Sequence, residues 1–399
     1  MAATEKGVWD LQDVRDKQLQ SEWDYTTLDN ELWTWGSGDK GYTAQNSQVQ
    51  YSSPIQIPGG WLRTKPYHDA SVMAAIKSDS TLWVWGRNYE GALGLNCSYT
   101  GGSCPVNSKS SPTQIPSVGG FNTWNVVASG ASQVVAIKSD NTLHGWGRNH
   151  TGGLGLNSEG TAGRRSRPTQ IGTDNNWSDV TAGDAAYMAI KTDGTLWTWG
   201  ENENPNGVLG LNDINDRSSP TQVPGSWASM TKGFRYANAA IKTDGTLWMW
   251  GGNNDGMMGQ NSPEPSKRSS PVQIPGSWSK VDVGDAQAAG IKTDGTLWTW
   301  GKNEYGNLGH NNPLSAHKSS PTQVPGTNWA DVAMSGVYTL ASKTDGTLWS
   351  WGYNNQGGLG QNQPQLTIVK SPVQVGAVTP WTSVHIGGEN NTSYAILQQ

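Results

Sequence analysis

The ten residues KTDGTLWTWG occupy positions 191–200 and recur, letter for letter, at 292–301. Near copies stand at 242–251 (KTDGTLWMWG) and 343–352 (KTDGTLWSWG). Aligned on W-x-W-G, the sequence holds seven instances, and successive final glycines are 50, 61, 53, 51, 50 and 51 residues apart. A fixed period of this length indicates a repeat architecture, which has to be interpreted before domains are counted.

The repeat also explains the tryptophan content, because the chain has 22 Trp against only 2 Phe. The W-x-W-G segments contain thirteen of them, since His144 replaces one. Two more, Trp9 and Trp23, lie outside the pattern. The remaining seven recur once per unit: Trp61, Trp124, Trp177, Trp227, Trp278, Trp329 and Trp381.

Each unit predicts four short antiparallel strands, as residues 177–223 illustrate. The first strand is W-x-x-V, the second ends at Lys191, and L-W-T-W-G is the third. The Asp-Gly pair between the second and third predicts a type I′ hairpin, in which both turn residues have positive φ. Both tryptophans of the third strand should share one face and pack between adjacent sheets, because side chains alternate along a strand. The proline in S-S-P-T-Q-V suits a fourth strand at the sheet edge.

Four antiparallel strands in each of seven units predict an all-β fold, a seven-bladed β-propeller of four-stranded antiparallel blades. Such an array must close or leave sheet edges exposed. The last copy stops after the strand that contains Tyr394–Leu397, with no hairpin partner behind it, and the first copy opens near Trp33 with little before its turn. We therefore predict that the C-terminal strand pairs in the first blade and closes the ring.

The pattern K-T-D-G-T-L-W-x-W-G-x-N-x-x-G-x-L-G over residues 26–399 resembles the regulator of chromosome condensation repeat family. The resemblance implies a seven-bladed propeller. The first copy departs from the pattern because no Leu-Gly step follows Gly41, which predicts an irregular blade. The founding member activates a small GTPase on chromatin, but this sequence shows neither the basic tail nor the wedge insertion of that protein. Bacterial relatives act by presenting propeller loops to a partner, so the fold implies a platform.

Composition excludes several partner classes. The net charge is −5 and no long Lys/Arg run exists, whereas nucleic-acid binding draws its affinity from cations that neutralise phosphates. We expect no nucleic acid as partner. No run of 18 apolar residues is present, so we expect no membrane insertion. The N-terminal sequence lacks the regions of a signal peptide.

We predict that the chain is not an enzyme, with no cofactor, no metal and no catalytic residue. Its six histidines are scattered without metal-ligand spacing, and no recognised nucleophile motif occurs. His144 in place of Trp reads as a packing variant. The repeated lysines before T-D-G are interpreted as solvated or paired blade residues, although such a ring could bind an anionic polymer. These lysines are Lys77, Lys138, Lys191, Lys242, Lys292 and Lys343.

Since every copy builds a blade, function should lie where the copies differ. The interval of 61 residues contains an insertion at 97–108, and loops on a rigid scaffold commonly carry recognition. We assign it as a candidate recognition loop, and the alternative is a tolerated surface insertion. Cys97 and Cys104 are either bridged across this loop or free thiols. The candidate recognition residues are Ser98, Tyr99, Thr100, Pro105 and Asn107.

The second departure is the N-terminal segment, residues 1–25, which reads as a short helix ahead of the propeller at 26–399. A helix this short does not persist alone in water, so its apolar side chains must dock on the propeller or on an assembly. Its opening G-V-W-D-L resembles G-V-W-S-L segments near the ends of phage appendage proteins. We assign as a candidate assembly anchor Val8, Trp9, Leu11, Val14 and Trp23.

The leading hypothesis is a non-enzymatic virion structural protein of a tailed bacteriophage, a tail, fibre or capsid appendage displayed for host attachment or decoration. It would be made in the host cytoplasm, join other virion proteins through its N-terminus, and contact a host surface receptor, protein or glycan, through its loops. It would be oligomeric within the assembly. The alternative is a free bacterial binding or inhibitor protein, cytoplasmic or secreted without a signal peptide. A GTPase exchange factor is the third hypothesis.

Overall fold

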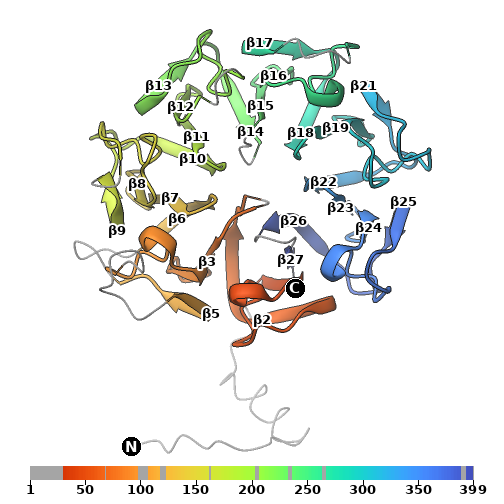
Figure 1. Ribbon diagram of the computed structural model, residues 1–399, viewed down its shortest axis with the longest axis horizontal. Helices are drawn as coiled ribbons and strands as arrows, with labels where there is room; N and C mark the ends of the chain where they lie inside the picture. The colour runs from red at the N-terminus through yellow and green to blue at the C-terminus, as the bar shows by residue number, and fades with distance from the viewer. Residues whose placement is uncertain are drawn as a thin grey trace, which may run out of the picture.

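The computed structural model describes residues 30–67, 69–97, 107–116, 123–160, 163–202, 206–231, 236–262, 267–387 and 392–398. Within these residues the strands form six antiparallel sheets arranged around a central axis (Figure 1). Five sheets have four strands and one has seven. Short 3-10 turns interrupt some connections: η1 (Asp39–Gly41), η2 (Tyr89–Gly91), η5 (Asn254–Gly256) and η6 (Asn355–Gly357).

In each four-stranded sheet the strands run outward from the axis in chain order (Figure 1). The innermost strands are β6 (Trp124–Ser129), β10 (Trp177–Ala182), β14 (Trp227–Met230), β18 (Trp278–Val283), β22 (Trp329–Met334) and β26 (Trp381–Gly387). The second strands are β3 (Val72–Lys77), β7 (Gln133–Lys138), β11 (Ala186–Lys191), β15 (Ala237–Lys242), β19 (Gln287–Lys292), β23 (Tyr338–Lys343) and β27 (Thr392–Leu397). The third strands are β1 (Glu31–Gly36), β4 (Leu82–Arg87), β8 (Leu143–Gly147), β12 (Leu196–Gly200), β16 (Leu247–Gly251), β20 (Leu297–Gly301) and β24 (Leu348–Tyr353). The outermost strands are β5 (Ser108–Gln114), β9 (Arg165–Gln170), β13 (Arg217–Val223), β17 (Arg268–Ile274), β21 (Lys318–Gln323) and β25 (Ile368–Gln374).

The seven-stranded sheet consists of two blades that share the long strand β2 (Tyr51–Thr64). Its first half pairs with β1 as an outer strand, and its last residues pair with β3 as an inner strand. Blade 1 is therefore β26, β27, β1 and the first half of β2, and blade 2 is the second half of β2 with β3, β4 and β5. Blades 3 to 7 follow in chain order, each with four strands, which confirms the predicted seven-bladed propeller.

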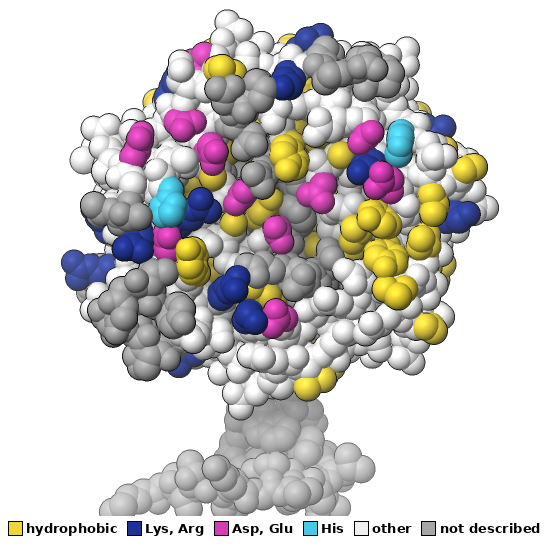
Figure 2. Space-filling view, viewed as in Figure 1, with side chains coloured by type: hydrophobic (Ala, Val, Ile, Leu, Met, Phe, Trp, Pro, Cys, Tyr) yellow, Lys and Arg dark blue, Asp and Glu magenta, His cyan; other side chains and the backbone are white. Residues whose placement is uncertain are grey.

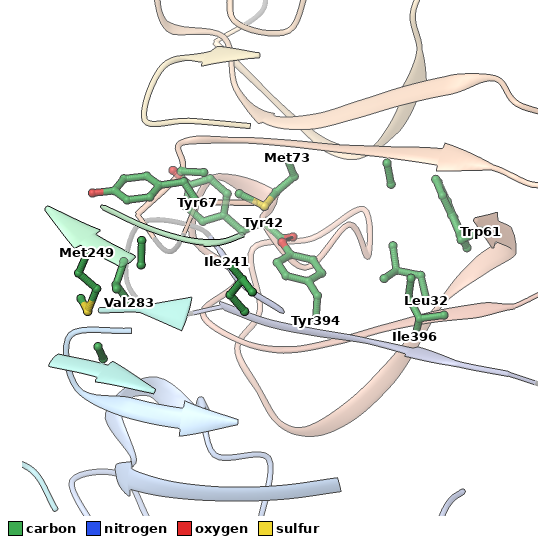
Figure 3. Packing of buried hydrophobic residues seen from close by; sticks show 14 of the residues in the cluster. Leu32, Tyr42, Trp61, Tyr67, Met73, Ile241, Met249, Val283, Tyr394 and Ile396 are labelled. Atoms are coloured by element: carbon green, nitrogen blue, oxygen red, sulfur yellow. Dashed lines mark hydrogen bonds between the residues drawn. The ribbon is translucent and has the colours of Figure 1, made fainter. Parts of the chain in front are cut away.

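The ring closes in blade 1, as predicted. The C-terminal strand β27 lies between β26 and β1, and Leu32 of β1 is in register with Ile396. Both side chains are buried, and Figure 3 shows them beside Trp61 of β2. The Tyr394 hydroxyl donates to the carbonyl oxygen of Tyr42, so β27 also contacts the connection that follows β1. The two ends of the described chain thus complete one sheet.

The hairpins between second and third strands differ from the predicted type I′ turn. In the turn after Lys191, only Gly194 has positive φ, and Asp193 does not. The Lys191 N–H donates to the Thr195 carbonyl at 3.0 Å and the Gly194 N–H to the Lys191 carbonyl at 2.9 Å. This is a three-residue loop ending in a left-handed glycine. The Asp193 carboxylate stabilises it by accepting from the Thr195 N–H and hydroxyl.

Neighbouring blades are joined by the second tryptophan of each W-x-W-G segment. Trp199, for example, is fully buried and donates its indole N–H to the carbonyl oxygen of Gly153 in the preceding blade, at 3.0 Å. The prediction that these indoles pack between adjacent sheets is confirmed. The equivalent donor and acceptor pairs are Trp35–Gly358, Trp85–Tyr42, Trp146–Ala92, Trp250–Val208, Trp300–Met257 and Trp351–Asn307.

The first copy is more regular than its sequence predicts. It forms the same 3-10 turn, with Lys40 at φ 51 where Glu90 of the second copy has φ 52. Ala44 occupies the place of the last glycine in G-x-L-G and adopts φ 59, close to the φ of 63 to 77 of those glycines. An L-residue other than Gly is strained there. Blade 1 therefore keeps the geometry of the connection without the glycine that suits it.

Candidate functional site: the loop face

The ring has two faces that differ in construction. The hairpins between second and third strands lie on one face, here called the turn face. The W-G-x-N-x-x-G-x-L-G connections between third and outer strands lie on the opposite face, here called the loop face, because adjacent strands are antiparallel. Loops on a fixed scaffold are the usual place for recognition, and the copies differ most in these connections.

A buried asparagine makes the same two kinds of hydrogen bond in each of six connections. The Asn303 side chain is 1% exposed, and its Oδ1 accepts the backbone N–H of Leu308 at 3.2 Å. Its Nδ2 donates to the Pro313 carbonyl at 3.2 Å. The residues beside the asparagine are thereby presented on a preformed backbone. The equivalent asparagines are Asn88, Asn149, Asn202, Asn253 and Asn354.

The variable side chains of blades 2 and 3 meet across the blade boundary. His150 Nε2 lies 2.9 Å from Glu90 Oε1, and the Glu90 side chain is only 4% exposed. Arg87 and Arg148 hold the position just before the asparagine in these two blades. This part of the loop face thus combines two arginines with a buried glutamate that contacts a histidine.

Blades 5 to 7 present a second group. Lys302 Nζ lies 3.0 Å from Glu304 Oε2. The hydrogen bond with Glu304 raises the pKa of Lys302, and the charge of Asp255 in the neighbouring blade acts in the same direction. Tyr305 and Tyr353, from adjacent blades, stack with ring centroids 5.3 Å apart and planes 20° apart. The position before the asparagine is thus cationic in blade 6 and aromatic in blade 7.

An exposed apolar residue lies beside the aromatic pair. Leu366 is 64% exposed although its φ is 68, a conformation that is strained for a bulky side chain. Its N–H donates to the Asn354 carbonyl at 3.1 Å, and Ile368, also exposed, is in register with Tyr353. Figure 2 shows hydrophobic side chains gathered on one side of the ring, where Figure 1 places β24 and β25. Charged side chains of both signs are scattered over the rest of that view.

The predicted recognition loop leaves from the loop face of blade 2. Asn88 Nδ2 donates to the Cys97 carbonyl at 3.3 Å, and the Asn88 N–H donates to the Asn107 carbonyl at 2.8 Å, so one residue holds both ends of the insertion. Asn107 is exposed. Cys97 is disulfide-bonded, and the pairing with Cys104 stays a prediction because Cys104 is outside the described residues. Also outside them are Ser98, Tyr99, Thr100 and Pro105, as well as the anchor residues Val8, Trp9, Leu11, Val14 and Trp23.

The central channel contains a polar cavity of about 240 Å³ lined by inner strands of several blades. Its charged groups largely serve the fold. Lys65 pairs with Asp179, Asp282 accepts the Met334 N–H at 2.9 Å, and Asp331 accepts the Val384 N–H at 3.1 Å. In the described part of the chain no group of three or more His, Cys, Asp or Glu could hold a metal ion. Nor does that part contain a helix long and apolar enough to cross a membrane.

The repeated lysines on the turn face are paired in a way that the sequence interpretation missed. Lys242 Nζ lies 3.8 Å from the ring centroid of Trp248 and 5.3 Å from that of Trp227. A cation over an indole face is stabilised by the ring quadrupole, so these lysines help to hold the strands of one blade together. The constant spacing of Lys and Trp in K-T-D-G-T-L-W is the sequence pattern that could have indicated this contact. The equivalent contacts are Lys77–Trp83, Lys191–Trp197, Lys292–Trp298 and Lys343–Trp349.

In blade 3, His144 takes the place of the tryptophan that the lysine contacts in the other blades. Its ring packs against Trp124 in a T-shaped contact at 5.6 Å. Burial lowers the pKa of His144 to about 4, and the neighbouring Lys138 acts in the same direction. The histidine is therefore neutral at ordinary pH and fills the place of a tryptophan, as expected for a packing variant.

Comparison with known proteins identifies the repeat. The sequence model of the RCC1-like domain matches residues 70–395. Among curated relatives, the ultraviolet-B receptor UVR8 of Arabidopsis thaliana is 28% identical over 63% of this chain and 55% of its own length. The probable E3 ubiquitin-protein ligase HERC6 of Homo sapiens is 28% identical over 44% of this chain and 17% of its own. The chain thus spans about half or less of these curated relatives.

Solved structures agree on the fold. Human WBSCR16 superimposes with a TM-score of 0.78 at 16% identity, over 93% of this chain and 99% of the other. Prp20p of Saccharomyces cerevisiae superimposes with a TM-score of 0.78 at 17% identity, over 94% and 92%. That protein was studied for its binding to Gsp1p and histones. At these identities the likeness concerns the architecture.

Proposed function

The chain belongs to the RCC1-like domain family, and we propose that it is a non-enzymatic platform that binds a protein partner through the loop face. The family contains binding and regulatory proteins, such as the similar ultraviolet-B receptor. The ligase relative is matched over only 17% of its length, so its activity is not transferred. Prp20p, which shares the fold, binds other proteins.

The observation that carries this proposal is the contrast between fixed backbone and variable side chains in the connections. Buried asparagines make the same hydrogen bonds in each connection, while the positions just before them carry Arg87, Lys302 or Tyr353 in different blades. Tyrosine is enriched among the residues that dominate binding at protein interfaces. The stacked Tyr305 and Tyr353 lie beside the exposed Leu366. The strain at Leu366 is maintained by the Asn354 contacts, which supports a role outside the fold.

The test is an affinity purification from the native source with the wild type and the variant Tyr305→Ala/Leu366→Ser. The matched control is Val373→Ser, which removes an exposed apolar side chain from outer strand β25. One protein enriched by the wild type and the control, but lost with the double variant, is expected. Equal recovery of that partner by all three proteins would refute the loop face as the binding surface.

For the biological setting we propose the virion of a tailed bacteriophage, with residues 1–25 as the anchor and the propeller displayed toward a host receptor. The support is the G-V-W-D-L opening and the start of the first strand at Glu31 on the turn face, opposite the loop face. Mass spectrometry of purified particles should find the chain. Deletion of residues 1–25 should abolish incorporation while receptor binding persists.

The alternative is a free bacterial binding or inhibitor protein, in the cytoplasm or secreted without a signal peptide. In that case the chain is absent from particles and the deletion has no effect on assembly. A GTPase exchange factor would accelerate nucleotide release from a GTPase, and we expect no acceleration. These outcomes separate the three hypotheses without further structural work.

A further inference from the structure

Two grooves of the same construction lie on the outer rim of the ring between neighbouring blades. The first has a volume of about 450 Å³ between blades 4 and 5, and the second about 360 Å³ between blades 5 and 6. They are lined by residues from the same positions of the repeat. The equivalent pairs are Trp248 and Trp298, Lys242 and Lys292, Ser270 and Ser320, Pro271 and Pro321, and Asn212 and Asn261.

The indole of each groove is held in place before any ligand arrives. The Trp248 N–H donates to the Thr246 hydroxyl at 2.9 Å, and that hydroxyl donates to Asp244 at 2.6 Å. Lys242 lies over the ring at 3.8 Å from its centroid. Trp298 has the same three partners in its own blade. Fixed rings reduce the entropy that binding must offset, so these half-buried indoles are preorganised platforms.

The polar lining consists of amides, hydroxyls and cations. In the first groove Asn212 and Gln222 are exposed, and Thr221 and Ser270 are half-buried. The lining of both grooves includes a lysine and no carboxylate. The first groove is also lined by Trp227, whose buried indole N–H has no hydrogen-bond partner among the described residues.

We propose that these grooves bind hexose units of an oligosaccharide. The C–H face of a pyranose ring is apolar and matches an indole or proline ring, while its hydroxyl edge matches amides, hydroxyls and an ammonium group. The volumes are at the lower end of the range for small-molecule sites. A proline-rich peptide is the competing occupant, because it also docks on aromatic-lined grooves. The four amide and hydroxyl side chains around one indole favour a hydroxylated ligand over prolyl rings.

Recurrence of the groove in adjacent blades suits a repeating polymer. A chain of sugars that engages both grooves gains affinity from the second contact without a new type of interaction. This inference does not rest on the protein partner of the loop face. The two surfaces involve different residues, so either can fail without the other.

The test is calorimetric titration of the full chain with cellohexaose, chitohexaose and maltohexaose, with indole fluorescence recorded in parallel. The variants are Trp248→Ala/Trp298→Ala and, to keep the indoles, Ser270→Tyr/Ser320→Tyr, which fills both grooves from the outer strands. Each pair should weaken binding of the recognised sugar by about tenfold or more. The loop-face variant Tyr305→Ala is the matched control and should bind like the wild type.

Thermal melting of each variant shows whether it is folded. If the alanine pair does not fold, the tyrosine pair, which keeps both indoles, still tests the proposal. The inference is overturned if none of the three hexasaccharides binds the wild type. It is equally overturned if the tyrosine pair binds the sugar as well as the wild type does. A proline decapeptide that binds the grooves while the sugars do not would assign them to a peptide instead.

Discussion

The indole Nε1 of Trp35 lies 2.8 Å from the carbonyl oxygen of Gly358, although 323 residues separate the two in the chain. The bond joins blade 1 to blade 7 in the way that the other six tryptophans join consecutive blades. The ring is thus closed twice, once by the strand pairing of β27 with β1 and once by this contact between side chain and backbone.

The first prediction concerns this contact. Trp35→Phe removes one of two donors to the Gly358 carbonyl, the other being the Ser393 hydroxyl at 2.8 Å, and replaces a fully buried indole by a smaller ring. We expect the free energy of unfolding to fall by about 2–4 kcal/mol, from the lost hydrogen bond and the cavity together. Denaturant titration measures it. Trp33→Phe, at a half-buried position of the same strand, is the control and should cost less.

The second prediction uses the strain in the first copy. Ala44→Gly relieves an alanine at φ 59, the position where the other copies have glycine. The left-handed conformation costs alanine about 1–2 kcal/mol, and glycine loses about 0.5–1 kcal/mol in chain entropy on folding. We therefore expect a net gain of up to about 1.5 kcal/mol. A fall in the melting temperature of this variant would show that Ala44 packs better than the backbone argument allows.

The third prediction compares two glycines with positive φ. At Gly309 a Cβ would lie 2.7 Å from Trp351 Nε1, whereas at Gly172 nothing lies within 4 Å. Gly172→Ala should cost about 1–2 kcal/mol from the backbone alone. Gly309→Ala should cost more, because the neighbouring indole must also move and its bond to Asn307 weakens. Equal losses for the two variants, measured by thermal unfolding, would contradict the close packing at the blade boundary.

The fourth prediction is a pH dependence that originates at His144. Burial lowers the pKa of this histidine from its ordinary 6.5 to about 4. Because the unfolded chain binds this proton more readily, stability falls as the pH drops from about 6.5 to 4. The full loss is on the order of 3 kcal/mol.

His144→Trp restores the indole of the other blades and should remove that dependence. Unfolding midpoints of the two proteins, measured between pH 7 and pH 4, should diverge steadily as the pH falls. Asp140 interacts with His144 and belongs to the same effect, whereas the other turn aspartates are common to both proteins. Hydrogen bonds from Thr195 lower the pKa of Asp193, for example, and both proteins share its effect, which is felt only at lower pH. Parallel curves would argue against a neutral buried histidine.

Most of the fold could be predicted from the sequence, because period and alternation determine strands within a blade. The pairing of Tyr394–Leu397 with the first blade followed from an unpaired strand at the end of the repeat. The hairpin type was predicted wrongly. Asp193-Gly194 fits two loop lengths, and the side-chain bonds of Asp193 to Thr195 favour the longer one.

The candidate site was less accessible to sequence reasoning. The stacking of Tyr305 on Tyr353 and the contact of His150 with Glu90 join residues of different blades, and no pattern within one unit specifies how two blades meet. The strain at Leu366 depends on the backbone of a connection that differs in every copy. The insertion at 97–108 was visible as a break in the period, and its place beside Asn88 came from the structure.

The pairing of Glu31 with Leu397 has a mechanical consequence. Both ends of the propeller lie at neighbouring positions on the turn face. A stalk fused to either end would therefore attach to the turn face and leave the loop face pointing away from it. Pulling on the two ends against each other would load the pairing of β27 with β1, since the two ends of the described chain meet in this pair. Joining the two ends by a linker and opening the chain between two later blades should give a circularly permuted ring, whose new ends lie away from the pairing of β27 with β1.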